Sequence, residues 1–380
     1  MTEPHAPEDS GASTGSGRVD AGEDDRTARR EEPHRIPSRI ASLLPSATEI
    51  VCALGLGDRL VLRSHECDHP EWVARIPWAT EPRDEPPDSS VEIDQGIQRL
   101  IQEGLSIYRV HDHTLKRTAP QVILTQDQCR VCAVPFETIQ EAVQRLLDES
   151  TRIVSLSPND LDSVLGDVLR VAEALAVPER GRALVHQMRE AMSEISARAR
   201  RSTQWRGRTG GTGSPGGRRR SPAEEEGRAA PEGGSPAEGP RPRVLTIEWI
   251  EPLMVAGNWM PELVEMAGGE NLLGVAGEHS PWVEWEDMKG LDPDLILVMP
   301  CGFDLARTRG AAEALRDLPG WPGLRAVVEG RVALIDGHQY FNRPGPRLVD
   351  SLEILVEIFH EGWPGPGDGP PRWEWMQQGM

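Results

Sequence analysis

The chain has 380 residues, enough for two domains with cores of ordinary size. Its formal net charge of −20 at pH 7 argues against nucleic acid and anionic membranes as partners, because both repel an acidic surface. No apolar run of about 18 residues is present, so we expect no membrane insertion. Five cysteines, dilute in a long chain, are not typical of a disulfide framework and favour a reducing compartment.

Residues 1–38 are polar, charged and rich in Gly and Ser, and this composition predicts a disordered N-terminal tail. The segment lacks the apolar h-region of a secretory signal. We therefore expect a cytoplasmic protein, and a periplasmic one only if the true start or the export route differs.

A first α/β lobe is predicted over residues 39–157. "RIASLL" indicates a buried strand, and "PSATEIVCALGLG" a helix that begins at Ala47, because Ser46 and Glu49 have the spacing of a capping box. Gly55 is a natural helix stop. "RLVLRS" indicates a second strand, which is followed by the polar loop "HECDHP". Strand, helix and strand in close succession are typical of an α/β fold.

Helical spacing of apolar residues predicts bridging helices over residues 158–201, interrupted at Pro178. Residues 202–242 are low-complexity Gly, Pro, Arg and Glu sequence and are expected to be a disordered surface insertion.

The second half repeats the design of the first. "LDPDLILVMPCG" echoes "TAPQVILTQDQC", since each has a proline, an apolar strand, and a cysteine just past the strand. We predict a C-terminal α/β lobe over 243–361 and a tail over 362–380. The expected fold is therefore α/β, with two Rossmann-like lobes, a ligand cleft between them, and a long bridging helix.

Ligands of such sheets bind beyond the carboxyl ends of the strands. That rule predicts that aromatic, thiol and imidazole side chains from separate loops lie at one cleft. Such side chains suit a large planar ligand, a soft metal, or a metal held in a macrocycle. The candidate ligand-binding residues are His65, Glu66, Cys67, Gln126, Cys129, Cys132, Trp249, Trp259, Cys301, His338 and Tyr340.

The C-x-x-C of Cys129 and Cys132 allows several interpretations. A structural zinc site needs two further ligands, and none follows at ribbon-like spacing. A thioredoxin-like motif also follows a strand and opens a helix, but the expected preceding Trp is missing. We favour cysteines that line the cleft or pack beside it. His111 and His113 could bind metal on a strand edge, although a solvated loop is favoured. No catalytic motif is found, so we expect no catalytic residues and no enzyme.

The stretch "RIASLLPSATEIVCALGLGDRLVLRSHECDHP" resembles the opening of the cobalamin and iron-siderophore substrate-binding proteins of ABC importers. "DPDLILVMPCGFD" and "WIEPLMVAGNWMPELVEMAGGENLLG" fit the same plan, and the resemblance covers residues 39–360 without the insertion. The S-H-E-C-D and Q-C-x-V-C-A-V loops are similar to the cysteine-bearing subgroup that is often labelled cobalamin-binding. The resemblance implies a ligand held between two lobes that a rather rigid helix bridges.

The resemblance also implies docking on a permease through a glutamate on each lobe, seven residues before the proline of the "PDLIL"-type strand. Glu286 holds that position before Pro293. In the first lobe the position before Pro120 is His113, with Asp112 beside it, so one docking carboxylate is expected rather than two.

The leading hypothesis is a monomeric, non-catalytic solute-binding protein for cobalamin or a related metal chelate such as an iron-siderophore, with an ABC permease as partner and no required cofactor. Trp249, Trp259 and Tyr340 would supply apolar faces, and His65 or a cysteine would approach the metal. An alternative is a cytoplasmic thiol-dependent metal-handling or redox protein. Its thiols would be Cys67, Cys129, Cys132 and Cys301. A third is a scaffold that recruits partners through its disordered segments.

Overall fold

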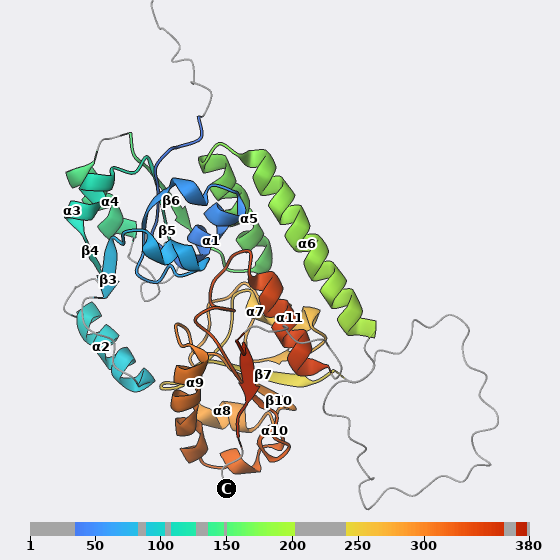
Figure 1. Ribbon diagram of the computed structural model, residues 1–380. Coiled ribbons are helices and arrows are strands. Elements are labelled where there is room, and N and C mark those ends of the chain that lie inside the picture. Colours follow the sequence, from blue (N-terminus) through green and yellow to red (C-terminus); the bar gives the residue numbers. More distant parts are fainter. Residues whose placement is uncertain are drawn as a thin grey trace, which may run out of the picture. The chain divides into compact units, whose positions relative to one another are not determined.

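The computed structural model describes residues 35–82, 89–102, 108–126, 136–147, 150–201, 241–360 and 370–377. The segment Ile36–Met380 forms one compact unit (Figure 1). Nearly all of the predicted N-terminal tail and of the predicted insertion, together with Cys129 and Cys132, lies outside the described residues.

The first lobe contains a four-stranded parallel sheet with the order β2-β1-β5-β6. The strands are β1 (Ile40–Ser42), β2 (Leu60–Arg63), β5 (Val122–Gln126) and β6 (Arg152–Leu156). Alternate side chains of β5 enter two different cores, since Val122 and Leu124 pack on one face and Ile123 on the other. Both faces are covered, as parallel sheets require. The covering helices are α1 (Pro45–Ala53), α3 (Asp112–Thr118), α4 (Phe136–Leu146) and α5 (Leu161–Ala174).

A small antiparallel pair of strands and one further helix belong to the same lobe. They are β3 (Thr80–Pro82), β4 (Tyr108–Val110) and α2 (Ser90–Gln102).

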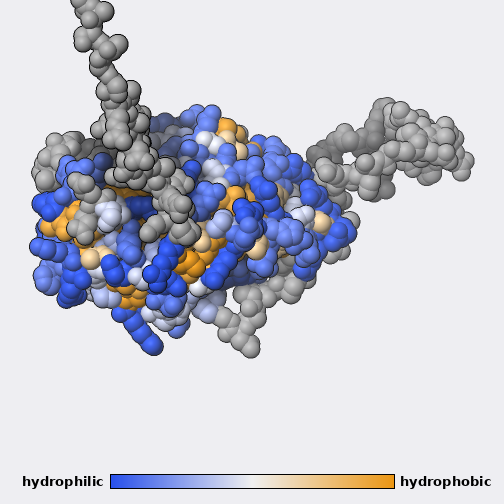
Figure 2. Space-filling view, turned by 90° about the horizontal axis from the view of Figure 1, so that it is seen from above, coloured by the Kyte–Doolittle hydropathy of each residue, from blue (hydrophilic) through white to orange (hydrophobic). Residues whose placement is uncertain are grey.

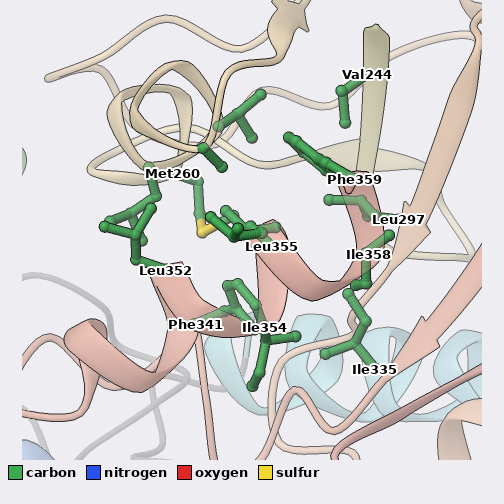
Figure 3. Close-up of a cluster of buried hydrophobic side chains, with 14 of the residues drawn as sticks. Val244, Met260, Leu297, Ile335, Phe341, Leu352, Ile354, Leu355, Ile358 and Phe359 are labelled. Atoms are coloured by element: carbon green, nitrogen blue, oxygen red, sulfur yellow. The ribbon is translucent and has the colours of Figure 1, made fainter. Parts of the chain in front are cut away.

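The second lobe is built around a sheet with the order β12-β11-β10-β7-β8, to which β9 adds by pairing with β7. Its strands are β7 (Arg243–Trp249), β8 (Met254–Val255), β9 (Glu270–Leu272), β10 (Leu295–Val298), β11 (Val332–Ile335) and β12 (Trp373–Trp375). Its helices are α7 (Met260–Met266), α8 (Trp285–Lys289), α9 (Leu305–Ala312), α10 (Arg325–Val328) and α11 (Leu348–Phe359). Helix α11 fills the core, with Phe359 near Val244 and Leu297 of the sheet and Leu355 near Met260 of α7 (Figure 3).

The stretch predicted as a C-terminal tail contributes a strand. Trp373 and Trp375 of β12 pair with β11 in antiparallel register and pack against the second lobe's core. The short alternating Trp-Glu-Trp pattern explains the pairing, because aromatic residues favour strands even at a sheet edge.

The two lobes share the helix α6 (Pro178–Arg201), which begins at the predicted break. Val185 and Met188 pack into the first lobe's core, whereas Met192, Ile195 and Ala199 pack into the second's. One helix is thus buried in both hydrophobic cores, which holds the lobes together through apolar contact. No helix of the described residues is long and apolar enough to cross a bilayer. The face in Figure 2 is largely hydrophilic, with hydrophobic residues in small groups.

Helix α1 differs from its prediction. It begins at Pro45 rather than Ala47, and its N-cap residue is Leu44, without a side-chain capping bond. Proline at the first helical position already has the required φ angle and lacks only an N–H that would be unpaired there. Glu49 is therefore not a capping residue. The predicted stop is confirmed, because Gly55 has a φ of +71° just after the helix.

Candidate functional site: a polar network that joins the two lobes

The site begins with Glu49, which α1 of the first lobe holds almost fully buried, at 4% exposure. Its carboxylate accepts hydrogen bonds from Arg347 Nε at 2.9 Å and from Arg347 Nη2 at 2.5 Å. Arg343 Nη1 lies 3.3 Å from the same carboxylate. Both arginines come from the segment between β11 and α11 of the second lobe. A buried carboxylate with two guanidinium partners is therefore a direct electrostatic link between the lobes.

Asp68, in the "HECDHP" loop after β2, is the second acidic centre. It accepts hydrogen bonds from Arg343 Nη1 at 2.6 Å and Gln339 Nε2 at 2.7 Å. His338 Nε2 lies 2.9 Å from the same carboxylate. Burial opposes ionisation of Asp68, but the hydrogen bonds and charges of His338 and Arg343 outweigh it and hold the pKa far below its usual range. Asp68 is thus a fixed negative charge at the junction of the lobes.

His65, Glu66 and His338, all candidates from the sequence, lie in one chain of contacts beside this centre. Glu66 Oε1 is 3.2 Å from His65 Nε2, and Glu66 Oε2 is 3.8 Å from His338 Nδ1. Burial would raise the pKa of Glu66, but the hydrogen bond and charge of His65, with the charges of His338 and Arg343, lower it below its usual value. These three side chains are partly exposed, so they combine fixed charge with access to a ligand.

Trp249 and Cys301 belong to a separate apolar group. Trp249 packs edge-to-face on Phe303, with ring centroids 5.4 Å apart, and Met254 completes the cluster. Ile93 of α2 and Cys301 pack against it. This group brings residues of both lobes to one apolar contact.

The remaining candidates occupy more interior positions. Cys67 is 1% exposed and accepts a hydrogen bond from Thr48 Oγ1 at 3.0 Å. Trp259 is buried in the second lobe's core, where its Nε1 donates to Phe341 O at 2.8 Å. Gln126 is buried at the end of β5, and Tyr340 is half-buried with Arg347 5.4 Å above its ring. Packing accounts for Cys67 and Trp259, and a ligand role for these four stays a prediction.

Sequence reasoning missed Asp68, Gln339, Arg343 and Arg347, and it assigned Glu49 to a helix cap. Asp68 could have been found, because it stands in the same strand-end loop as His65 and Glu66. The two arginines flank "PGP", and no local pattern there points to partners in the other lobe.

The predicted docking positions lie on two short helices that each precede a central strand. Glu286 is on α8 before β10, its side chain is 76% exposed, and its carboxylate lies 3.7 Å from Lys289. Asp112 and His113 are on α3 before β5, and Asp112 accepts a hydrogen bond from Arg145 at 2.6 Å. His111 and His113 thus lie at the N-cap and in the first turn of a helix, rather than on a strand edge or in a loop.

The thiol-based alternative finds no support among the described residues. They contain no group of three or more His, Cys, Asp and Glu side chains that could hold a metal ion. Burial raises the pKa of Cys67 to about 11, against the hydrogen bond from Thr48, and burial together with the charge of Glu49 raises the pKa of Cys52 to about 11. Such thiols are poor nucleophiles near neutral pH.

Comparison with known families decides between these alternatives. Residues 235–338 match the family model described as periplasmic binding protein. This part of the chain is similar to periplasmic binding proteins. The resemblance predicted from the sequence is confirmed at this level, and proteins of this type are substrate-binding proteins rather than enzymes and carry no cofactor of their own.

Two relatives extend this similarity over most of the chain. An uncharacterised ABC transporter substrate-binding lipoprotein, YvrC of Bacillus subtilis, is 24% identical over 347 residues, which cover 90% of this chain and 84% of YvrC. A vitamin B12-binding protein of Photorhabdus laumondii is 21% identical over 329 residues, which cover 86% of this chain and 89% of that protein.

Solved structures show the same fold. A periplasmic heme-binding protein from Pseudomonas aeruginosa has a TM-score of 0.57 at 20% identity, with 86% of this chain and 94% of that chain covered. The periplasmic vitamin B12-binding protein of Vibrio cholerae has a TM-score of 0.52 at 18% identity, with coverage of 85% and 96%. The binding-protein fold with two α/β lobes is thereby confirmed.

The expected cytoplasmic location is wrong. The relatives are a lipoprotein and periplasmic proteins, which points to an extracytoplasmic location. The search for an apolar h-region considers only one export route. The cysteine argument was also weak, because burial leaves Cys52 and Cys67 unreactive in any compartment.

Proposed function

We propose that the chain is the extracytoplasmic substrate-binding protein of an ABC importer and holds a corrinoid, or a related metal chelate, between its two lobes. The single observation that carries this proposal is the network at the junction of the lobes, where His65 and Glu66 of one lobe meet His338 of the other. The names of the relatives support it, since one is a vitamin B12-binding protein and a structural neighbour binds heme.

The partly exposed polar side chains suit the periphery of such a ligand. Glu66 accepts hydrogen bonds from amide groups, and the imidazoles of His65 and His338 either donate or accept. Imidazole is also a ligand for iron and other transition metals. Asp68 and Arg343 hold His338, and Thr80 Oγ1 lies 3.0 Å from His65 Nδ1, so both imidazoles are positioned before a ligand arrives.

The apolar part of the proposed contact comes from the Trp249 cluster. Trp249 and Phe303 present aromatic surface next to Cys301, and Tyr340 adds a half-buried ring that lies under the guanidinium of Arg347. Flat apolar faces of this kind suit a macrocycle, whose large ring is poorly solvated by water.

Two features make the proposed site rigid. One face of helix α6 packs into both cores, and the arginine pairs of Glu49 and Asp68 tie the lobes directly. A preformed site loses little conformational entropy when the ligand binds. We therefore expect binding with small closure of the lobes rather than a large hinge motion.

Calorimetric titration tests the proposal with cyanocobalamin and, separately, hemin as probes. We expect saturable micromolar or tighter binding of one chelate, weakened at least about tenfold by Glu66→Gln. Glu190→Gln on α6 is the matched control and should bind as the wild type does, since Glu190 is exposed and its carboxylate lies 3.4 Å from His186. Absence of saturable binding for both chelates would exclude this ligand class.

Docking through Glu286 is part of the same proposal. Its exposed carboxylate on α8 can meet a basic group of the permease. We expect Glu286→Arg to lower uptake of the chelate in cells that carry the transporter, while binding by the purified protein is unchanged. Equal uptake by the variant and the wild type would remove Glu286 from the docking surface.

A further inference from the structure

The apolar group around Trp249 is almost fully covered in the folded chain. Trp249 is 8% exposed, Met254 9% and Phe303 1%. A macrocycle that contacts these side chains, as the proposed function requires, therefore needs part of their cover to move away. Helix α6 and the ion pairs of Glu49 and Asp68 hold the two lobes together, so the part that moves has to be smaller than a lobe.

The cover of this group comes from both lobes. Among the described residues, Ile93, Cys301 and Ala311 pack against it. Cys301 and Ala311 are fixed parts of the second lobe, since Cys301 N donates to Glu248 O at 3.2 Å and Ala311 of α9 also packs into a core of that lobe. Ile93 is the member of this cover that the first lobe supplies, and it lies on α2.

Helix α2 is attached to the first lobe at one place. Strands β3 and β4 pair in antiparallel register with Pro82 opposite Tyr108, so the chain leaves the lobe and returns to it side by side. Neither core of the first lobe contains a described side chain of α2. Figure 1 shows α2 beyond this pair of strands and apart from α1 and α5. The helix is therefore a flap on a two-stranded base, and its Ile93 packs on the other lobe.

The start and the middle of α2 do not depend on the rest of the lobe. Ser89 Oγ accepts a hydrogen bond from Glu92 N at 3.2 Å and donates one to the Glu92 carboxylate at 2.9 Å, which caps the helix. Apart from the helix's own backbone, no described residue comes within 4 Å of the Cβ position of Gly96. A helix of this length gains most of its stability from packing of an apolar face. The contact of Ile93 therefore helps to decide where α2 lies.

Resting on the proposed function, we propose that α2 is a lid on the cleft and that Ile93 covers the Trp249 group until the chelate takes its place. Ile93 and the flat face of a macrocycle cannot contact the same surface at once, so the two compete. The apparent affinity for the chelate is lowered in proportion to the fraction of molecules in which α2 covers the group. The covered state in turn keeps Trp249 and Phe303 away from water and from other apolar partners.

Alkylation of Cys301 tests the lid without any chelate, because this partly exposed thiol packs against the same group as Ile93. We expect iodoacetamide to modify Cys301 at least about threefold faster in Ile93→Asp, since a carboxylate is costly on an apolar surface. Ile93→Ala should change the rate in the same direction and by less. Val91→Asp, at an exposed position of the same helix, is the matched control and should react as the wild type does. Unchanged labelling of the buried Cys67 shows that the rest of the fold is intact.

Titration with cyanocobalamin and with hemin tests the competition. Ile93→Asp should bind the chelate at least about threefold more tightly than the wild type, and Val91→Asp should bind it equally well. Hydrogen–deuterium exchange read by mass spectrometry gives a second measurement on the wild type. The amides of α2 should exchange faster when the chelate is bound, whereas those of α5 should not.

Two results would overturn the lid. One is equal labelling of Cys301 in Ile93→Asp and the wild type. The other is weaker chelate binding by Ile93→Asp, which would make Ile93 a contact of the ligand rather than its competitor. If no protein binds a chelate and Cys301 still reacts faster in Ile93→Asp, the proposed function fails and the lid over the apolar group stands.

Discussion

Glu49 on α1 and Arg347 at the N-cap of α11 form a bidentate ion pair, with nitrogen–oxygen distances of 2.5 and 2.9 Å, across 298 positions of the sequence. Neither side chain is more than slightly exposed. A charge-assisted pair of this kind has a defined geometry as well as a favourable energy. It therefore fixes how the end of α1 meets the start of α11.

Replacement of Glu49 by glutamine should lower the free energy of unfolding by about 3 kcal/mol, because it leaves Arg347 and Arg343 buried with less compensating charge. Urea unfolding followed by tryptophan fluorescence measures the change. Glu179→Gln, in an exposed pair with Arg182, is the control and should leave the transition unchanged. An equal effect of the two substitutions would show that burial of the Glu49 pair is without energetic consequence.

Asp167 on α5 should make stability fall as the pH rises. Burial raises the pKa of its carboxyl to about 6, against the opposing charge of Arg170. The folded state therefore binds more protons than the unfolded state between about pH 4 and pH 6, and stability decreases across that window as pH increases. Relative to the wild type, Asp167→Asn should gain about 2 kcal/mol between pH 4 and pH 7.

Denaturant unfolding at several pH values measures this slope. The control is Asp162→Asn, an exposed carboxylate on the same helix that pairs with Arg189. Parallel pH profiles for Asp167→Asn and the wild type would contradict the raised pKa.

The two cysteines with raised pKa values should resist alkylation in the folded protein. With pKa values of about 11, Cys52 and Cys67 carry very little thiolate at pH 8. We expect iodoacetamide to modify both more than about tenfold more slowly than in the urea-unfolded chain. Mass spectrometry of proteolytic peptides reads each site separately. Rapid labelling of Cys67 in the folded state would contradict its raised pKa and support a thiol-based function.

Gly274 should not tolerate a side chain. A Cβ at this position would lie 1.9 Å from Ala256 O, so the backbone would have to move. Gly274→Ala should lower the free energy of unfolding by about 2–3 kcal/mol. Gly166→Ala in α5 is the contrasting variant, because nothing lies within 4 Å of its Cβ position, and it should stabilise the chain by about 0.5–1 kcal/mol. Thermal unfolding of both variants compares them, and similar shifts would contradict the expected close contact.

The strands and the bridging helices could be predicted because their signals are local. The apolar run of Val122–Gln126, the break at Pro178 and the stop at Gly55 each depend on a few neighbouring residues. The start of α1 was placed at Ala47 instead of Pro45, because Ser46 and Glu49 have the spacing of a capping box that the helix does not form. The actual partner of Glu49, Arg347, is too distant in sequence to leave a pattern.

The site, like the fold, was predictable only where its signals are local in sequence. The rule of strand carboxyl ends brought His65, Glu66 and His338 together, since strand position decides where those loops emerge. The rule does not separate a side chain that faces the loop from one that packs inward. Cys67 and Trp259 were therefore selected for their chemistry, although both lie in the interior. Asp68 and Arg343 act as a pair across 275 positions, and only a folded chain reveals such a pair.

The ion pairs across 275 and 298 positions also affect the order in which contacts form during folding. A ribosome makes the whole first lobe, with Glu49 and Asp68 in it, long before it reaches Arg343 and Arg347. Domains fold as they emerge, from the N-terminus onward. Glu49 and Asp68 therefore lack these arginine partners until the last part of the second lobe is available to fold, and α1 and the loop after β2 reach their final surroundings only then.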